Sequence, residues 1–163
     1  MQILETEIIS INAEMIRPLR HAELRKGQDF STTSYLRDHD AETFHMAYMA
    51  ESNVVTCATF YPEKSDKILA KNAYRLRGMA TDSNFRRKGY ARDLMNESFQ
   101  KLKSIGADIL WCNARLVAIS FYESLGFEIL GEIFNIEGIG PHYYMYKKRS
   151  YQKHLEIHHF QNP

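Results

Sequence analysis

The sequence is poor in the residues that cross-link a chain or carry it into a membrane. Two of its 163 residues are cysteines, Cys57 and Cys112, and they form no C-x-x-C pair. This spacing excludes a zinc ribbon and a thioredoxin-type site, and we expect two buried, reduced thiols. No apolar run reaches the length of a membrane span, and residues 1–11, with Glu5 and Glu7, do not resemble a signal peptide. We therefore expect a cytoplasmic protein.

An excess of charge of one sign is also missing. Lys and Arg total 21 and Asp and Glu total 20, so the formal net charge is +1. A domain that binds nucleic acid through bulk positive charge is strongly basic, and a balanced chain has no general attraction to an anionic membrane. We therefore expect neither nucleic acid nor a membrane as a partner.

The composition, 44% hydrophobic and 25% charged, is that of a globular domain with a core of its own. We predict one domain over residues 1–149, followed by a polar C-terminal tail over residues 150–163. The tail contains His154, His158 and His159. Metal binding needs ligands held in a fixed geometry, so we expect no metal site there.

Hydrophobic periodicity predicts an α/β fold with a mixed sheet. Asn12 could cap a helix that Pro18 limits to a first-turn or kinked start, and residues 19–25 should be helical. Glu51, Ser52 and Asn53 fit a hairpin turn. Strands are predicted at residues 7–11, 44–50, 54–61, 73–81, 107–112, 127–134 and 142–146, and helices at residues 19–25, 91–105 and 117–125. Gly78 is unusual inside a strand and indicates a bulge or a close approach by another group.

The segment over residues 75–92 carries the strongest chemical signal. It passes from a strand through a basic loop into a helix, and it has six basic residues against one acidic residue, Asp82. A helix start with small residues, here Gly89 and Ala91, lets an anion approach unpaired backbone N–H groups. The segment has neither the Walker pattern nor G-x-G-x-x-G, so it favours a pyrophosphate site of another type. A solvated basic turn and a single-stranded nucleic acid site are the alternatives.

A second motif, Ala118-Ile-Ser-Phe-Tyr122-Glu-Ser-Leu-Gly-Phe127, follows at a separation that gives the pair its specificity. Together the two motifs resemble the GCN5-related N-acetyltransferases, in which R/Q-x-x-G-x-G/A forms the cofactor loop. The resemblance implies a central mixed, mostly antiparallel sheet, splayed at the cofactor site and flanked by helices. It also implies acetyl-CoA as the donor, without a metal. The implied donor-binding residues are Met79, Ala80, Thr81, Arg86, Arg87, Lys88, Gly89, Tyr90, Ala91 and Arg92.

A closer resemblance is to the bacterial glyphosate N-acetyltransferases. It is carried by residues 19–25, 75–81, 111–115, 131–134 and 140–142, whereas residues 30–41 depart from that pattern. It implies that Arg25, Arg77 and Arg115 grip an anionic acceptor, a task suited to the planar guanidinium. It also implies His142 as the general base and Tyr122 as the general acid. The alternatives are a structural histidine, a core tyrosine, and ion pairs of Arg77 or Arg115 with Glu132.

These observations predict an N-acetyltransferase for a small anionic amine, such as an amino-phosphonate or a phosphorylated or acidic amino acid. Two alternatives stay open. One is an acetyltransferase of the same family that acts on an amino sugar, a polyamine or a protein amine. The other is an acyl-CoA-binding module without catalysis. We expect the protein to act as a monomer or a homodimer.

Overall fold

The computed structural model describes residues 4–149. These residues form two compact units: residues 4–62 with 76–102, and residues 63–75 with 103–149. Strand β4 (Ala73–Thr81) runs from the second unit into the first and coincides with the predicted strand. The prediction of a single domain over residues 1–149 stays a prediction, and the predicted tail with its three histidines lies outside the described residues.

In the first unit, three antiparallel strands precede β4: β1 (Thr6–Ile11), β2 (Phe44–Ala50) and β3 (Asn53–Pro62). Strands β2 and β3 form the predicted hairpin. Its two turn residues, Glu51 and Ser52, have φ values of 50° and 67°, as a tight turn that matches the sheet twist requires. The unit also contains helices α1 (Ala13–Leu24) and α2 (Tyr90–Ser104) and short 3-10 helices at Phe30–Thr33 and Ser83–Phe85.

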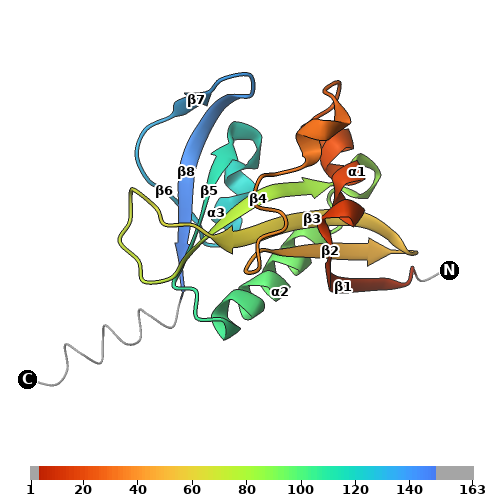
Figure 1. The fold of residues 1–163 in the computed structure, drawn as a ribbon, viewed down its shortest axis with the longest axis horizontal. Helices are drawn as coiled ribbons and strands as arrows, with labels where there is room; N and C mark the ends of the chain where they lie inside the picture. Colours follow the sequence, from red (N-terminus) through yellow and green to blue (C-terminus); the bar gives the residue numbers. More distant parts are fainter. Residues whose placement is uncertain (1–3, 150–163) are drawn as a thin grey trace, which may run out of the picture. The chain divides into compact units, whose positions relative to one another are not determined.

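Helix α1 is continuous from Ala13, six residues before the predicted helical segment at residues 19–25, and its start matches the predicted cap Asn12. The Asn12 side chain caps it by accepting a hydrogen bond of 3.1 Å from the Met15 N–H. Pro18 lies inside the helix, where it removes one N–H donor, and the expected restriction to a first turn is wrong because the helix continues past it. The helix buries Ile16 and Leu19 in a core with Ala47 and other residues of the sheet, which outweighs the missing bond. Figure 1 shows α1 against β3.

In the second unit, the first three residues of β4 pair in parallel with β5 (Ile109–Arg115). Strand β5 pairs antiparallel with β8 (Gly140–Lys148), which also pairs with β6 (Glu128–Ile129) and β7 (Phe134–Ile136). Its helices are α3 (Ile119–Ser124) and a 3-10 turn at Leu116–Ala118. The predicted mixed, mostly antiparallel sheet is confirmed.

Three strand predictions in the second unit were wrong in extent, and one of them is β8, which extends two residues beyond the predicted range 142–146 at each end. The single strand predicted over residues 127–134 is divided into β6 and β7. Gly131, at φ +84°, stands between them in a conformation that a strand cannot contain. Strand β5 starts at Ile109 and ends at Arg115, two residues later at its start and three later at its end than predicted. Ladder pairing to β8 continues through Arg115, which apolar content alone did not indicate.

Candidate functional site

The predicted donor loop is an exposed turn in the first unit. Residues 86–89 are exposed, and α2 begins directly after them at Tyr90. Arg87 and Gly89 have φ values of 61° and 80°. Left-handed residues among ordinary ones are typical of the concave N–H arrangements that bind anions. A Cβ at Gly89 would meet nothing within 4 Å, so the backbone there is open to a ligand. The loop therefore fits a pyrophosphate.

The aromatic residues beside this loop pack against other side chains of the protein. The Tyr90 ring stacks on Tyr48 of β2 at a centroid distance of 4.3 Å, and Phe85 lies 6.2 Å from Tyr90. The Tyr90 ring thus packs onto the sheet. Only its backbone, at the start of α2, can contact a ligand. A nucleic acid site would need base-stacking aromatics, and this packing disfavours that alternative.

The end of β4, predicted to pair with the donor's pantetheine arm, is half-buried. Ala80 is buried, while Met79 and Thr81 are partly exposed, and the Thr81 hydroxyl lies 3.2 Å from that of Thr56. Gly78 has φ +64°, and a Cβ there would lie 3.0 Å from the Tyr35 ring and 3.2 Å from Arg20 Nε. The predicted close approach at Gly78 is confirmed, and Tyr35 and Arg20 are the groups that approach.

Tyr35 is surrounded by three guanidinium groups. Their carbon atoms lie 3.9 Å from the ring centroid for Arg20, 4.4 Å for Arg77 and 5.8 Å for Arg25. The ring face attracts cations, so it holds these side chains near one another despite their mutual repulsion. Two of the three predicted acceptor-binding arginines are therefore brought together on a residue that sequence reasoning did not select.

The three cations around Tyr35 differ in their partners. Arg20, fully buried, donates to both oxygens of Asp38 at 2.7 and 3.0 Å and to the Thr59 hydroxyl at 2.7 Å. Within residues 4–149, neither Arg25 nor Arg77 forms an ion pair with a carboxylate. Three guanidinium groups thus meet one carboxylate, which leaves a local excess of positive charge.

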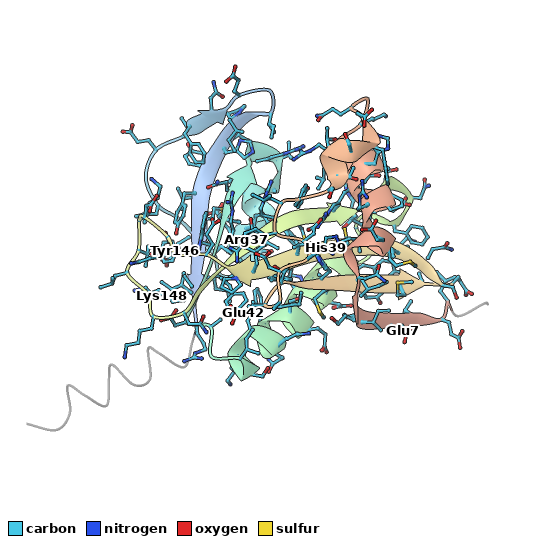
Figure 2. The ribbon with its side chains drawn as sticks, in the orientation of Figure 1. Glu7, Arg37, His39, Glu42, Tyr146 and Lys148 are labelled. Carbon is cyan, nitrogen blue, oxygen red and sulfur yellow. The ribbon has the colours of Figure 1, made fainter. Side chains whose placement is uncertain are left out.

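The segment that carries Tyr35 and Asp38 is fixed by buried polar contacts. The Tyr35 N–H donates to Asp38 at 2.9 Å, and His45 bonds the Thr59 hydroxyl and the Asp38 carbonyl. Burial alone would raise the pKa of Asp38, but the bonds from Arg20 and Tyr35 hold that pKa below its usual value. Burial lowers the pKa of His45, which is therefore neutral at neutral pH. Figure 2 labels Arg37 and His39, the residues that flank Asp38.

In the second unit, Arg115 and His142 are direct partners across β5 and β8. Opposite residues of an antiparallel pair project to the same face, so the two predicted site residues are neighbours. His142 is 3% exposed, and its Nδ1 lies 2.7 Å from the Gly140 carbonyl oxygen. A carbonyl can only accept, so Nδ1 carries the proton and Nε2 of the neutral ring keeps its lone pair. A general base needs this tautomer.

Tyr122 lies on α3, packed between two aromatic rings. Its ring centroid is 5.4 Å from that of Phe121 and 5.2 Å from that of Phe127. Burial raises the pKa of Tyr122 well above its usual value, so the hydroxyl is protonated at neutral pH. The residue can therefore donate a hydrogen bond, which is what a general acid at a sulfur atom must do.

The predictions about cysteines are confirmed, because Cys57 and Cys112 are buried and unpaired. Burial raises the pKa of both thiols to about 12, which makes them poor nucleophiles. Among residues 4–149, no group of His, Cys, Asp or Glu could hold a metal ion. No helix in this described range is long and apolar enough to cross a membrane.

Comparison with known proteins identifies the family. The model of the acetyltransferase (GNAT) family matches residues 11–127. The chain is also 36% identical over 141 residues to the uncharacterized N-acetyltransferase YitI of Bacillus subtilis (strain 168). The matched segment covers 86% of this chain and 95% of YitI. The chain belongs to the GNAT family. It is an N-acetyltransferase that uses acetyl-CoA as its donor and acts on amines.

Solved structures of this GNAT protein's relatives show the same fold. An aminoglycoside 6'-N-acetyltransferase complexed with coenzyme A superposes with a TM-score of 0.71 at 14% identity, over 87% of this chain and 96% of that one. The ribosomal-protein-S18-alanine N-acetyltransferase of Escherichia coli superposes with a TM-score of 0.67 at 17% identity, over 88% and 94% of the two chains. The predicted superfamily is confirmed. The closer resemblance to glyphosate N-acetyltransferases stays a prediction.

Proposed function

We propose that this GNAT enzyme acetylates the amino group of a small anionic acceptor. Amino-phosphonates and phosphorylated or acidic amino acids are the candidate classes. The observation that carries the proposal is the placement of Arg25 and Arg77 over the Tyr35 ring with no carboxylate partner in residues 4–149. A partly buried excess of guanidinium charge is costly alone, and an anionic ligand would compensate it with strong, charge-assisted hydrogen bonds.

Arg115 and His142 fit separate roles in this reaction. Within the second unit, Arg115 offers a guanidinium to an acidic group, and its strand neighbour His142 acts as the base. The acceptor nitrogen attacks the acetyl carbonyl as a neutral amine, and the proton that it loses passes to His142 Nε2. The Nδ1–H bond to the Gly140 carbonyl keeps the proton on Nδ1, which leaves Nε2 as the nitrogen that can accept the amine's proton.

The remaining roles belong to Tyr122 and the backbone of β4. As the new C–N bond forms, the C–S bond of the thioester breaks, and the sulfur of the leaving CoA takes its proton from the Tyr122 hydroxyl. Burial raises the pKa of Tyr122, so its hydroxyl is protonated at neutral pH and stabilises the leaving sulfur by donating a hydrogen bond to it. A main-chain N–H of Met79 or Ala80 stabilises the oxyanion that develops on the carbonyl.

A screen of matched amines tests the proposed acceptor class. Release of CoA thiol is measured with each acidic amine beside its neutral counterpart: aminomethylphosphonate and its diester, O-phosphoserine and serine, glutamate and glutamine. We expect kcat/KM for the preferred acid to exceed that of its counterpart by about tenfold or more, because charge-assisted bonds contribute about 1.5–3 kcal/mol. Turnover confined to neutral or cationic amines, such as amino sugars or polyamines, would show that the acceptor is of another class.

A further inference from the structure

Glu23, in the last turn of α1, holds the segment that leads into the donor loop. Its carboxylate accepts two hydrogen bonds, from the Ser83 N–H at 3.0 Å and from the Arg86 guanidinium at 2.8 Å. The Glu23 side chain is 13% exposed, whereas that of Arg86 is 61% exposed. The carboxylate is thus a largely enclosed anchor, and the arginine reaches back to it from the surface.

The helix that carries Glu23 is itself held in place. Three residues before Glu23, Arg20 is fully buried and bound to Asp38, and the neighbouring Leu24 packs against the core of the first unit. A carboxylate on such a helix has little freedom, so it fixes the position of whatever it binds.

The segment that Glu23 binds also has hydrogen bonds of its own. Ser83 begins the 3-10 helix Ser83–Phe85, and the next N–H, of Asn84, is bound by the Asp82 side chain at 2.9 Å. Arg86 ends this helix, and Arg87 adopts the left-handed conformation directly after it. Two carboxylates therefore hold the chain at the point from which the exposed turn 86–89 departs.

We propose that Glu23 is a positioning residue for donor binding, a claim that rests on the assignment of residues 86–92 to the CoA diphosphate. Glu23 touches no substrate. It fixes Ser83 and Arg86 so that the N–H groups of Arg87 to Ala91 are preorganised for the diphosphate. It also holds the guanidinium of Arg86, one of the predicted donor-binding residues, at the start of the loop.

The test compares Glu23→Ala and Glu23→Gln with the control Glu14→Gln. Glu14 lies on the same helix and pairs with Arg17 at the surface. Each variant is assayed with acetyl-CoA and with S-acetyl-pantetheine, which lacks the diphosphate, using any amine that supports turnover. For Glu23→Ala we expect KM for acetyl-CoA to rise about tenfold with kcat within twofold, and a smaller rise for Glu23→Gln, which keeps an oxygen for Ser83. The control and the truncated donor should show no change.

A purely structural role would lower activity with both donors alike, and that result, or an unchanged KM for acetyl-CoA, would overturn the inference. Calorimetric titration with CoA alone separates the two assumptions without any acceptor. If Lys88→Ala leaves CoA affinity unchanged, the assignment of the donor loop is wrong. If Lys88→Ala weakens CoA binding and Glu23→Ala does not, the loop assignment holds and the role of Glu23 is refuted.

Discussion

Replacing Asp38 with Asn should sharply destabilise the protein, because it leaves the buried Arg20 cation without its counter-charge. Asp38 accepts two bonds from Arg20 and one from the Tyr35 N–H, and the two charged side chains are 1% and 0% exposed. Removing one partner of such a buried pair costs about 3–5 kcal/mol. The Arg20 Nε–H already has no hydrogen-bond partner within residues 4–149, so the guanidinium is incompletely satisfied even before the Asp38 charge is removed.

Urea unfolding at pH 7 measures this loss as a change in the free energy of unfolding. Asp40→Asn is the control: Asp40 is exposed and pairs with Arg37 at the surface, and its loss should cost under about 1 kcal/mol. The double variant Arg20→Met with Asp38→Leu should recover much of the stability, because apolar replacement removes both buried charges. A loss below about 1 kcal/mol for Asp38→Asn, or an equal loss in the control, would refute the reasoning.

The same pair predicts a dependence on pH. Because the pKa of Asp38 is lower in the folded protein than in the unfolded chain, its contribution is complete above about pH 4, the ordinary carboxyl value. The contribution is lost as pH falls through the folded value. The stability difference between wild type and Asp38→Asn should therefore be constant from pH 7 to about pH 4 and shrink below that. A difference that already shrinks between pH 7 and 5 would contradict this assignment.

Three further predictions concern single residues. Burial lowers the pKa of His45 in the folded protein, so the unfolded chain takes up a proton first as pH falls below about 6.5 and stability should fall there. His45→Gln should flatten this dependence of stability on pH in urea titrations. An unchanged dependence would contradict the prediction. Gly78→Ala should lower the free energy of unfolding by about 1–3 kcal/mol, since the new Cβ meets Tyr35 and Arg20. Gly27→Ala has a similar φ but lies in open space, so it should cost less. Equal losses of stability in thermal unfolding would contradict the contact argument. His142→Gln should lower kcat about 10²- to 10⁴-fold with little change in KM for acetyl-CoA, and a kcat near that of wild type would remove His142 as the base.

The fold was predictable where local pattern and packing agree. Alternation and turn chemistry predicted strand β4 and the β2–β3 hairpin, and the predicted bounds lie within a few residues of the observed ones. The continuation of α1 through Pro18 was not, because the cost of Pro18 is local whereas the burial of Ile16 that offsets it depends on the sheet. Gly131 could have indicated the break between β6 and β7, since a positive φ is what glycine supplies.

Individual residues of the candidate site could be predicted from the sequence, but the contacts between residues far apart in the chain could not. The donor loop and the partners His142 and Arg115 came from motifs and a family resemblance. The contacts of Arg20 with Asp38 and Thr59 join residues 18 and 39 positions apart, so no local pattern reveals them. Tyr35 lies in the segment that departs from the resembled enzymes, and only the fold places its ring beside three arginines.

The specificity of Arg77→Ala tests the central claim most directly. The measurement is the ratio of kcat/KM for the preferred acidic amine to that for its neutral counterpart. It is made with wild type, Arg77→Ala and the control Lys26→Ala, which removes an exposed cation next to Arg25 in the sequence. If Arg77 binds the acceptor's acidic group, the ratio should fall about tenfold or more in Arg77→Ala and stay unchanged in Lys26→Ala. An unchanged ratio in Arg77→Ala, with both substrates slowed equally, would contradict the account.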